Sequence, residues 1–189
     1  MKLWTIQPQE VLDVLEQKGV YRCDYAKSEN QEECFRVAYE WLAAKMREKV
    51  APPEGISFPV WAWYKRYGKH KKPDLRTSGL AERGRKMFCL EIEIPDTEVV
   101  LSDFDAWHFV LNRMYLDDST CEAEWDANHA AYDALPPTEQ EKVLRESWDR
   151  IFDISPFKSD WKTRGDFVQA TFWELRKEQI RRIQPFTCR

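Results

Sequence analysis

The sequence lacks the long apolar run that a membrane span requires. No stretch approaches the roughly 18 apolar residues of a transmembrane helix, and the start, Met1 to Pro8, lacks the apolar core of a signal peptide. Glycine is scarce, with 6 residues in 189, and no Gly/Ser-rich linker divides the chain. We therefore expect a cytoplasmic protein with no membrane partner, folded as a single domain over residues 1–189.

The sequence also lacks the cysteine and histidine spacing of a metal site. Its five cysteines are widely separated, and none belongs to a Cys-x-x-Cys pair. The three histidines, His70, His108 and His129, do not fall at ligand spacing with one another or with any cysteine. We therefore expect reduced thiols and no bound metal.

Positive charge is concentrated in one segment. Residues 65–86, called the basic loop below, contain nine Lys or Arg and two acidic residues, a net charge of +7. The rest of the chain contains 20 basic and 31 acidic residues, so this segment opposes the charge of its own scaffold. Because cations neutralise phosphates, the loop favours a phosphate-bearing ligand. A solvated loop without a ligand is the alternative that the composition leaves open.

Three basic side chains of the loop are the candidates for phosphate contact. They are Lys71, Lys72 and Arg76, with Arg favoured because its planar guanidinium can donate two parallel hydrogen bonds. Asp74 lies two residues before Arg76, and an ion pair between the two would order the loop.

The segment before the basic loop is predicted to be an aromatic strand in a chain rich in tryptophan. Trp61 and Trp63 share one face of this strand, opposite Val60, Ala62 and Tyr64. The rings of Trp61, Trp63 and Tyr64 are candidates for stacking on a nucleobase or a nicotinamide. If Val60 and Ala62 line the core, the tryptophans face a groove. If the tryptophans are core instead, the stacking platform is lost.

Hydrophobic periodicity predicts helices and strands that do not alternate regularly. Helices are expected over 8–19, about 29–50, 102–115 and 138–152, the last opened by a Thr138–Glu141 capping box. Strands are expected over 3–7, 58–64, 87–94, 99–101, 167–175 and 180–186. The acidic residues 117–137 are predicted to form a surface excursion. This order indicates an α+β fold with a mixed or mostly antiparallel sheet and flanking helices.

The helix expected at 102–115 begins with a cluster of polar residues. Ser102 is predicted to be its cap, followed by Asp103 and Asp105 in the first turn and His108 beyond them. The Asp-x-Asp pattern suggests a metal or acid–base site. Carboxylates of a first turn also satisfy free backbone amides and complement the helix dipole, which is the commoner role. His108, four residues after Phe104, is expected beside the apolar face.

The strand predicted at 167–175 carries a polar row. Gln169, Thr171 and Trp173 share one of its faces. A cleft lined by these side chains and an edge strand that faces water would explain the pattern equally well.

The chain resembles a bacterial family, domain-of-unknown-function family 3841. The similarity covers nearly the whole length, but the family name implies no activity. It is carried by Leu3 to Gln7, Pro59 to Trp63, Pro73 to Arg76, Leu101 to Asn112, Ser147 and Trp148 with Ile151 to Asp153, and Gln169 to Trp173.

The chain is also similar, in its layout alone, to ADP-ribosyltransferase-like domains. Those domains begin with a strand and a helix that ends at glycine, echoed here by residues 3–7 and Gly19, and finish with a strand that carries a catalytic Glu. This chain has Thr5 where such enzymes place His or Arg, and Gln169 or Thr171 where the Glu is expected. Without that carboxylate, cleavage of the glycosidic bond of NAD would lose an electrostatic contribution.

These observations give two hypotheses, and they leave open whether the protein is an enzyme. In the first, it binds a nucleotide, NAD or nucleic acid, with ADP-ribosyltransferase-like chemistry as an option and NAD as the candidate cofactor. In the second, it is a non-catalytic module whose basic loop binds nucleic acid or an acidic protein. The candidate catalytic residues are Thr5, Gln7, Asp103 and Gln169. The candidate ligand-binding residues are Trp61, Trp63, Tyr64, Lys71, Lys72, Arg76, His108 and Trp173.

Overall fold

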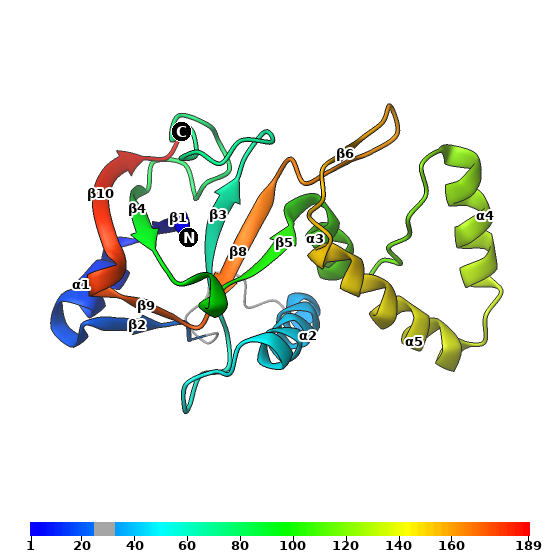
Figure 1. The fold of residues 1–189 in the computed structure, drawn as a ribbon, viewed down its shortest axis with the longest axis horizontal. Coiled ribbons are helices and arrows are strands. Elements are labelled where there is room, and N and C mark those ends of the chain that lie inside the picture. Colours follow the sequence, from blue (N-terminus) through cyan, green and yellow to red (C-terminus); the bar gives the residue numbers. More distant parts are fainter. Residues whose placement is uncertain (25–32) are drawn as a thin grey trace.

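A six-stranded antiparallel sheet forms the centre of the molecule (Figure 1). The computed structural model describes residues 1–24 and 33–189. The strands lie in the order β10-β4-β1-β3-β8-β5, and each neighbouring pair is antiparallel. They are β1 (Lys2–Gln7), β3 (Val60–Lys65), β4 (Lys86–Glu93), β5 (Val100–Asp103), β8 (Val168–Phe172) and β10 (Ile180–Thr187). The predicted α+β class with a mostly antiparallel sheet is confirmed.

Helices and two small sheets surround the central sheet. The α-helices are α1 (Gln9–Lys18), α2 (Glu33–Lys49), α3 (Phe104–Leu111), α4 (Glu122–Asp133) and α5 (Pro137–Ser147). Short 3-10 helices are η2 (Asp96–Glu98), η3 (Trp148–Phe152) and η4 (Lys177–Gln179). The small sheets pair β2 (Val20–Arg22) with β9 (Glu174–Arg176), and β6 (Phe157–Lys158) with β7 (Thr163–Arg164). No helix in the described part of the chain is long and apolar enough to cross a bilayer.

Two hydrophobic cores hold these elements together. In the first, Val11 and Leu15 of α1 pack with Leu3 and Leu90 of the sheet. The second joins α2, α3 and η3, and Trp148 of η3 is fully buried in it. The indole Nε1 of Trp148 donates to the carbonyl of Met114 at 2.9 Å, so burial leaves no unpaired donor there.

The first strand and helix form where the sequence predicts them. Pro8 precedes α1, and Gly19 ends it in the left-handed conformation at φ 73°. The backbone N–H of Gly19 donates to the carbonyl of Leu15 at 3.0 Å, which satisfies one of the last free carbonyls of the helix. The expected start of the next helix, near residue 29, lies outside the described residues.

The prediction of one strand over residues 167–175 is wrong. Residues 168–172 form β8 in the central sheet, whereas 174–176 form β9, which pairs with β2. Trp173 separates them. Its ring is buried, and its indole Nε1 donates to the carbonyl of Val50 at 2.8 Å, which ties the break in the strand to the end of α2.

The prediction that Ser102 caps α3 is also wrong. Ser102 lies within β5, and Asp103 is the cap. The Asp103 carboxylate accepts a hydrogen bond from the backbone N–H of Ala106 at 2.9 Å. Strand pairing therefore continues two residues beyond the predicted end at residue 101, because Ser102 pairs with Gln169 of β8 and Asp103 pairs with Val168.

Most of residues 117–137 are exposed, as expected, although Asp117 and Ser119 are buried. The segment contains the helix α4, which the sequence analysis missed. α4 and α5 form a helical arm at one end of the molecule (Figure 1). No side chain of α4 is fully buried. Trp125 stacks on His129 at 3.9 Å between ring centroids, and Tyr132 stacks on Tyr115 at 4.6 Å. Aromatic residues at helical spacing hold this helix in place of an aliphatic stripe.

The predicted capping box of α5 does not form. The helix begins at Pro137, directly after Pro136, and no side chain caps it. Pro137 has no N–H to satisfy and its fixed φ suits the first helical turn. The N–H groups of Glu139 and Gln140 both donate to the carbonyl of Pro136, at 2.9 Å. Glu141 instead accepts hydrogen bonds from Arg145 and Arg113.

Candidate ligand-binding sites

Four strands place one side chain each in a row across the sheet. Trp4 of β1 pairs with Trp63 of β3, Trp63 pairs with Gln169 of β8, and Gln169 pairs with Ser102 of β5. Residues paired directly across antiparallel strands project to the same face. The structure therefore brings together Trp63 and Gln169, both predicted from the sequence, with Trp4 and Ser102, which were not.

Trp61 lies on the same face as Trp63 but at the edge of the second core. Its ring is half-buried, 5.1 Å from the ring of Trp107 and 6.1 Å from that of Tyr39. Val60 and Ala62 are buried in the first core. Trp61 and Trp63 thus face away from the first core. Side chains of α2 and α3 cover part of the Trp61 ring.

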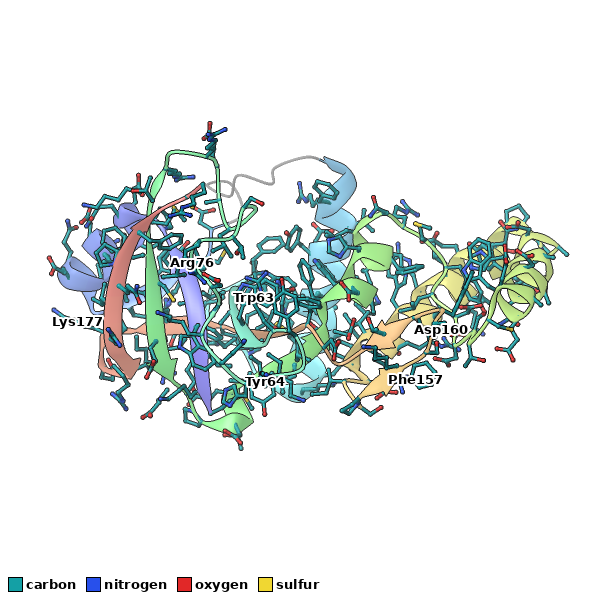
Figure 2. All side chains as sticks on the ribbon, turned by 90° about the horizontal axis from the view of Figure 1, so that it is seen from above. Trp63, Tyr64, Arg76, Phe157, Asp160 and Lys177 are labelled. Carbon is teal, nitrogen blue, oxygen red and sulfur yellow. The ribbon has the colours of Figure 1, made fainter. Side chains whose placement is uncertain are left out.

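Trp63 has an aromatic neighbour on one side and a cation near it. The Phe104 ring lies 5.0 Å from the Trp63 ring in an edge-to-face arrangement, and the Arg66 guanidinium lies 4.8 Å from the Trp63 centroid. Figure 2 shows Trp63 and Tyr64 near the middle of the molecule, with Arg76 further toward β4 and β10. His108 packs on Phe104 at 4.6 Å, so it joins this cluster through Phe104.

Arg66 is the functional candidate that the sequence analysis missed. Its Nε and Nη1 atoms are buried, and no described residue accepts a hydrogen bond from them. Two oxygen atoms of the row, Ser102 Oγ and Gln169 Oε1, are also buried and have no hydrogen-bond partner within the described chain. Buried polar groups are usually paired, so these side chains have hydrogen-bonding capacity that a bound ligand could use. The signal in the sequence was a basic residue two positions after Tyr64, the last residue of the predicted aromatic strand.

Thr5 and Gln7 lie on the opposite face of the sheet from this row. Thr5 is fully buried, donates to the carbonyl of Trp61 at 2.7 Å and accepts from Gln7 Nε2 at 2.6 Å. Successive residues of a strand point to opposite faces, which separates Thr5 from its neighbour Trp4. The structure does not bring these two candidate catalytic residues to Gln169.

Asp103 lies below the start of α3 with both carboxylate oxygens engaged. One accepts from Ala106, and the other accepts from the backbone N–H of Gly165 at 2.7 Å. The side chain is buried, with 2% of its surface exposed. These contacts correspond to the structural role that was the alternative for Asp103.

The basic loop lies over the sheet and is tethered at several points. His70 Nε2 is 2.8 Å from the carbonyl of Lys2, and its ring contacts Trp4 and Tyr64. Lys72 donates to Gln184 of β10. The loop is therefore held against β1, β3 and β10 by side chains and does not simply extend into solvent.

The side chains of the loop that were predicted to contact phosphate differ in whether a carboxylate already pairs with them. Arg76 donates two hydrogen bonds to Asp74, at 2.9 and 2.7 Å, as the sequence analysis expected. The hydrogen bonds from Arg76 hold the pKa of the Asp74 carboxyl well below its ordinary range. Lys71 is exposed and pairs with no carboxylate of the described chain. Trp173, another candidate, is buried at the end of α2 and does not join the Trp63 row.

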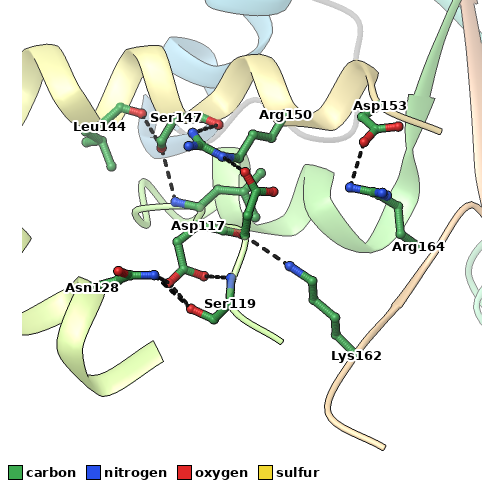
Figure 3. A network of polar contacts seen from close by, with 11 residues as sticks. Asp117, Ser119, Asn128, Leu144, Ser147, Arg150, Asp153, Lys162 and Arg164 are labelled. Atoms are coloured by element: carbon green, nitrogen blue, oxygen red, sulfur yellow. Dashed lines mark hydrogen bonds and ion pairs between the residues drawn. The ribbon is translucent and has the colours of Figure 1, made fainter. Parts of the chain in front are cut away.

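A second candidate site lies at the other end of the molecule. A cavity of about 340 Å³, called the arm pocket below, is lined by α3, by residues 116–119 before the arm, by Trp125 and Arg150, and by residues 161–164 at the β6–β7 hairpin. Figure 3 shows the polar groups around it: Arg150 and Arg164 contact acidic side chains, and Lys162 reaches the backbone carbonyl of Asp117. The sequence analysis did not predict this pocket, because its walls come from segments that are far apart in the chain.

Neither site shows the ligands of a metal ion. Within the part of the chain that the structure describes, no group of three or more His, Cys, Asp or Glu side chains could hold one. The thiols of Cys23, Cys89, Cys121 and Cys188 are free.

The fold and the sites together define an α+β protein built on one antiparallel sheet. The chain belongs to the family described as a domain of unknown function, DUF3841, whose family model matches residues 2–181. This confirms the resemblance found in the sequence. No curated protein and no solved structure matches the chain. The similarity to ADP-ribosyltransferase-like domains stays a prediction.

Proposed function

We propose that the protein binds a phosphate-bearing ligand, such as a nucleotide or NAD, at Arg66 and Trp63, with the basic loop supplying further cations. One observation carries this proposal. The Arg66 guanidinium lies 4.8 Å from the Trp63 ring, yet two of its nitrogens are buried without an acceptor among the described residues.

Arg66 is partly buried, and two of its guanidinium N–H groups are buried without an acceptor among the described residues. Leaving a buried donor without a hydrogen bond costs about 1–3 kcal/mol. A phosphate oxygen would accept these hydrogen bonds, and guanidinium groups are well suited to phosphate because they donate several hydrogen bonds at once. An anionic group bound beside Arg66 would therefore satisfy both donors.

The surroundings of Arg66 also suit a nucleotide. Lys69 and Lys71 of the basic loop are exposed, and no carboxylate in the described chain pairs with them. Their charge raises the local concentration of an anionic ligand. Trp63 is half-buried, so part of an aromatic surface remains beside the guanidinium for stacking on a base.

For ADP-ribosyltransferase-like chemistry, the support comes from Gln169. Of the four candidate catalytic residues it is the one in the Trp63 row, and its side-chain oxygen has no partner in the described chain. An amide oxygen can accept a hydrogen bond from a ribose hydroxyl, but it carries no negative charge to stabilise an oxocarbenium-like transition state. Release of nicotinamide from NAD, compared between wild type and Gln169→Ala, tests whether any transfer follows binding.

Calorimetric titration with ATP, NAD and a short RNA tests the binding proposal. We expect Arg66→Ala to weaken binding of the preferred nucleotide by about tenfold or more, which corresponds to about 1.4 kcal/mol. The control is Arg83→Ala, which removes the same charge from the same loop at an exposed position. Equal binding by wild type and Arg66→Ala would refute a site at Arg66.

The exposed, unpaired cations of the basic loop favour a second function, binding of an extended polyanion such as nucleic acid or an acidic protein. Such contacts are additive and weaken steeply with salt. In that case RNA alone binds, moderate salt abolishes binding, and Arg66→Ala and Arg83→Ala have equal effects. A nucleotide pocket at Arg66 would instead give unequal effects and weaker salt dependence, because buried contacts are screened less.

A further inference from the structure

The arm pocket contains more charged groups than its own ion pairs use. Its wall includes four carboxylates and three cations. Most of them are already engaged with one another or with the backbone. The groups that remain free define the ligand that the pocket can accept.

Both arginines of the pocket are neutralised. Arg164 forms an ion pair with Asp153 at 2.6 Å (Figure 3). It also donates its Nε to the carbonyl of Ser155. Arg150 forms an ion pair with Asp118 at 2.8 Å. Neither guanidinium therefore offers an uncompensated charge to a ligand.

Two of the remaining carboxylates are engaged as well. Asp103 accepts backbone hydrogen bonds at the start of α3 and at Gly165. Asp117 accepts hydrogen bonds from the hydroxyl and the backbone N–H of Ser119 and from Asn128 Nδ2 (Figure 3). These contacts fix the wall of the pocket and leave one carboxylate.

That carboxylate belongs to Asp105, and the matching free cation is Lys162. Asp105 lies at the exposed rim and has no hydrogen bond or ion pair with any described residue. Partial burial, and then the negative charge of Asp103, raise its pKa. The Lys162 ammonium donates only to the carbonyl of Asp117, at 3.4 Å. No ion pair joins Asp105 to Lys162.

Aromatic side chains supply the rest of the wall. Phe109 of α3, Trp125 of α4 and Trp161 of the β6–β7 hairpin all line the cavity. Trp161 is 43% exposed, which is high for a tryptophan that lies beside a cavity. These rings provide an apolar surface that a ligand would cover.

We propose that the arm pocket binds a zwitterion with an apolar body, namely a free amino acid with an aromatic side chain. Its ammonium would lie at Asp105 and its carboxylate at Lys162, while its side chain would pack on the rings of Phe109, Trp125 and Trp161. A cavity of about 340 Å³ lies within the size range of small-molecule sites. This site is separate from the proposed phosphate site, because Arg66 does not line the arm pocket.

The charge balance of the pocket argues against a phosphate there. Carboxylates outnumber cations four to three in the wall, and the arm, residues 122–147, has seven acidic residues and two basic ones. A dianion would meet net repulsion, whereas a zwitterion adds no net charge.

Calorimetry with three related ligands tests the proposal. L-phenylalanine carries both charges, phenethylamine lacks the carboxylate, and 3-phenylpropionate lacks the ammonium. We expect L-phenylalanine to bind about fivefold to tenfold more tightly than either analogue, since a half-exposed ion pair contributes about 1 kcal/mol. No binding of L-phenylalanine, or equal binding of all three ligands, would overturn the proposal.

Two charge-removing variants assign the ends of the ligand. Asp105→Asn should weaken binding of L-phenylalanine and phenethylamine about fivefold and leave 3-phenylpropionate unchanged. Lys162→Gln should weaken binding of L-phenylalanine and 3-phenylpropionate and leave phenethylamine unchanged.

Asp126→Asn is the matched control, because it removes a charge from an exposed position on α4 that does not line the pocket. Equal losses for all three ligands in either variant would contradict the assignment, and an unchanged thermal unfolding midpoint shows that the variant is folded. Arg66→Ala should leave L-phenylalanine binding unaltered, so failure of one proposal does not decide the other.

Discussion

The carboxylate of Asp103 accepts a hydrogen bond from the backbone N–H of Gly165 at 2.7 Å, across 62 residues of chain. Its other oxygen accepts from Ala106 at the start of α3. One buried side chain thus joins the end of β5, the first turn of α3 and the segment that leads into β8. Because Gln169 follows in β8 and residues 161–164 line the arm pocket, this contact positions parts of both candidate sites.

Replacing Asp103 should destabilise the fold. Asp103→Ala removes a helix cap and leaves the buried N–H of Gly165 without an acceptor, so we expect the free energy of unfolding to fall by about 2–4 kcal/mol. Asp103→Asn keeps one acceptor oxygen and should cost less. Urea denaturation at neutral pH measures both. Asp105→Ala is the control, because Asp105 makes no hydrogen bond within the described chain. A loss below about 0.5 kcal/mol for Asp103→Ala would contradict this structural role.

Gly165 should tolerate no side chain. It has φ +76°, and a Cβ added there would lie 2.6 Å from the backbone oxygen of Ile154. We expect Gly165→Ala to cost more than the roughly 1–2 kcal/mol of a left-handed residue alone, because backbone must also move. Gly79→Ala separates the two causes, since Gly79 has φ +81° and a Cβ there would meet nothing within 4 Å. Equal losses of thermal stability in the two variants would mean that the contact with Ile154 is unimportant.

The sequence predicted the elements whose signals are local. The pattern from β1 to Gly19 contains a strand period, a proline start and a glycine end, so this unit was found. β4 was found because Phe88, Leu90 and Ile92 recur at every second position. The break at Trp173 was missed because it depends on a distant acceptor, the carbonyl of Val50. α4 was missed because its stripe is aromatic and only partly buried.

The candidate sites were harder to predict, because they depend on contacts between residues that are far apart in the sequence. Trp63 and Gln169 stood out by residue type, and strand pairing brings them together. Arg66 was hidden among nine basic residues of its loop, and only the structure shows that its guanidinium lacks an acceptor within the described chain. The arm pocket unites Asp105 with Lys162, which are 57 positions apart and share no motif.

Acid should weaken the arm through Asp117. Burial opposes ionisation of this carboxylate, but hydrogen bonds from Ser119 and Asn128 outweigh it, and the pKa of Asp117 is lowered. A lowered folded-state pKa contributes stability that is present above the unfolded value of about 3.9 and is lost as pH falls through the folded value. The stability difference between wild type and Asp117→Asn should therefore shrink between about pH 5 and pH 2.

Denaturant unfolding at a series of pH values measures this difference. Asp126→Asn provides the baseline, because Asp126 is an exposed acid of the same arm. If the wild type and Asp117→Asn curves stay parallel over the whole range, the hydrogen bonds to Ser119 and Asn128 do not stabilise the ionised carboxylate.

The free thiols should differ strongly in reactivity. Burial is the main cause that raises the pKa of both Cys23 and Cys89 to about 11, so little thiolate forms at neutral pH. Cys188 is buried as well, whereas Cys121 is exposed at the start of α4. We expect iodoacetamide to label Cys121 first, and Cys89 and Cys188 only after denaturation, as measured by peptide mass spectrometry over time. Labelling of Cys89 at the rate of Cys121 in the native protein would show that β4 opens to solvent. Cys121→Ser should remove the fast phase assigned to this residue and leave the protection of Cys89 unchanged.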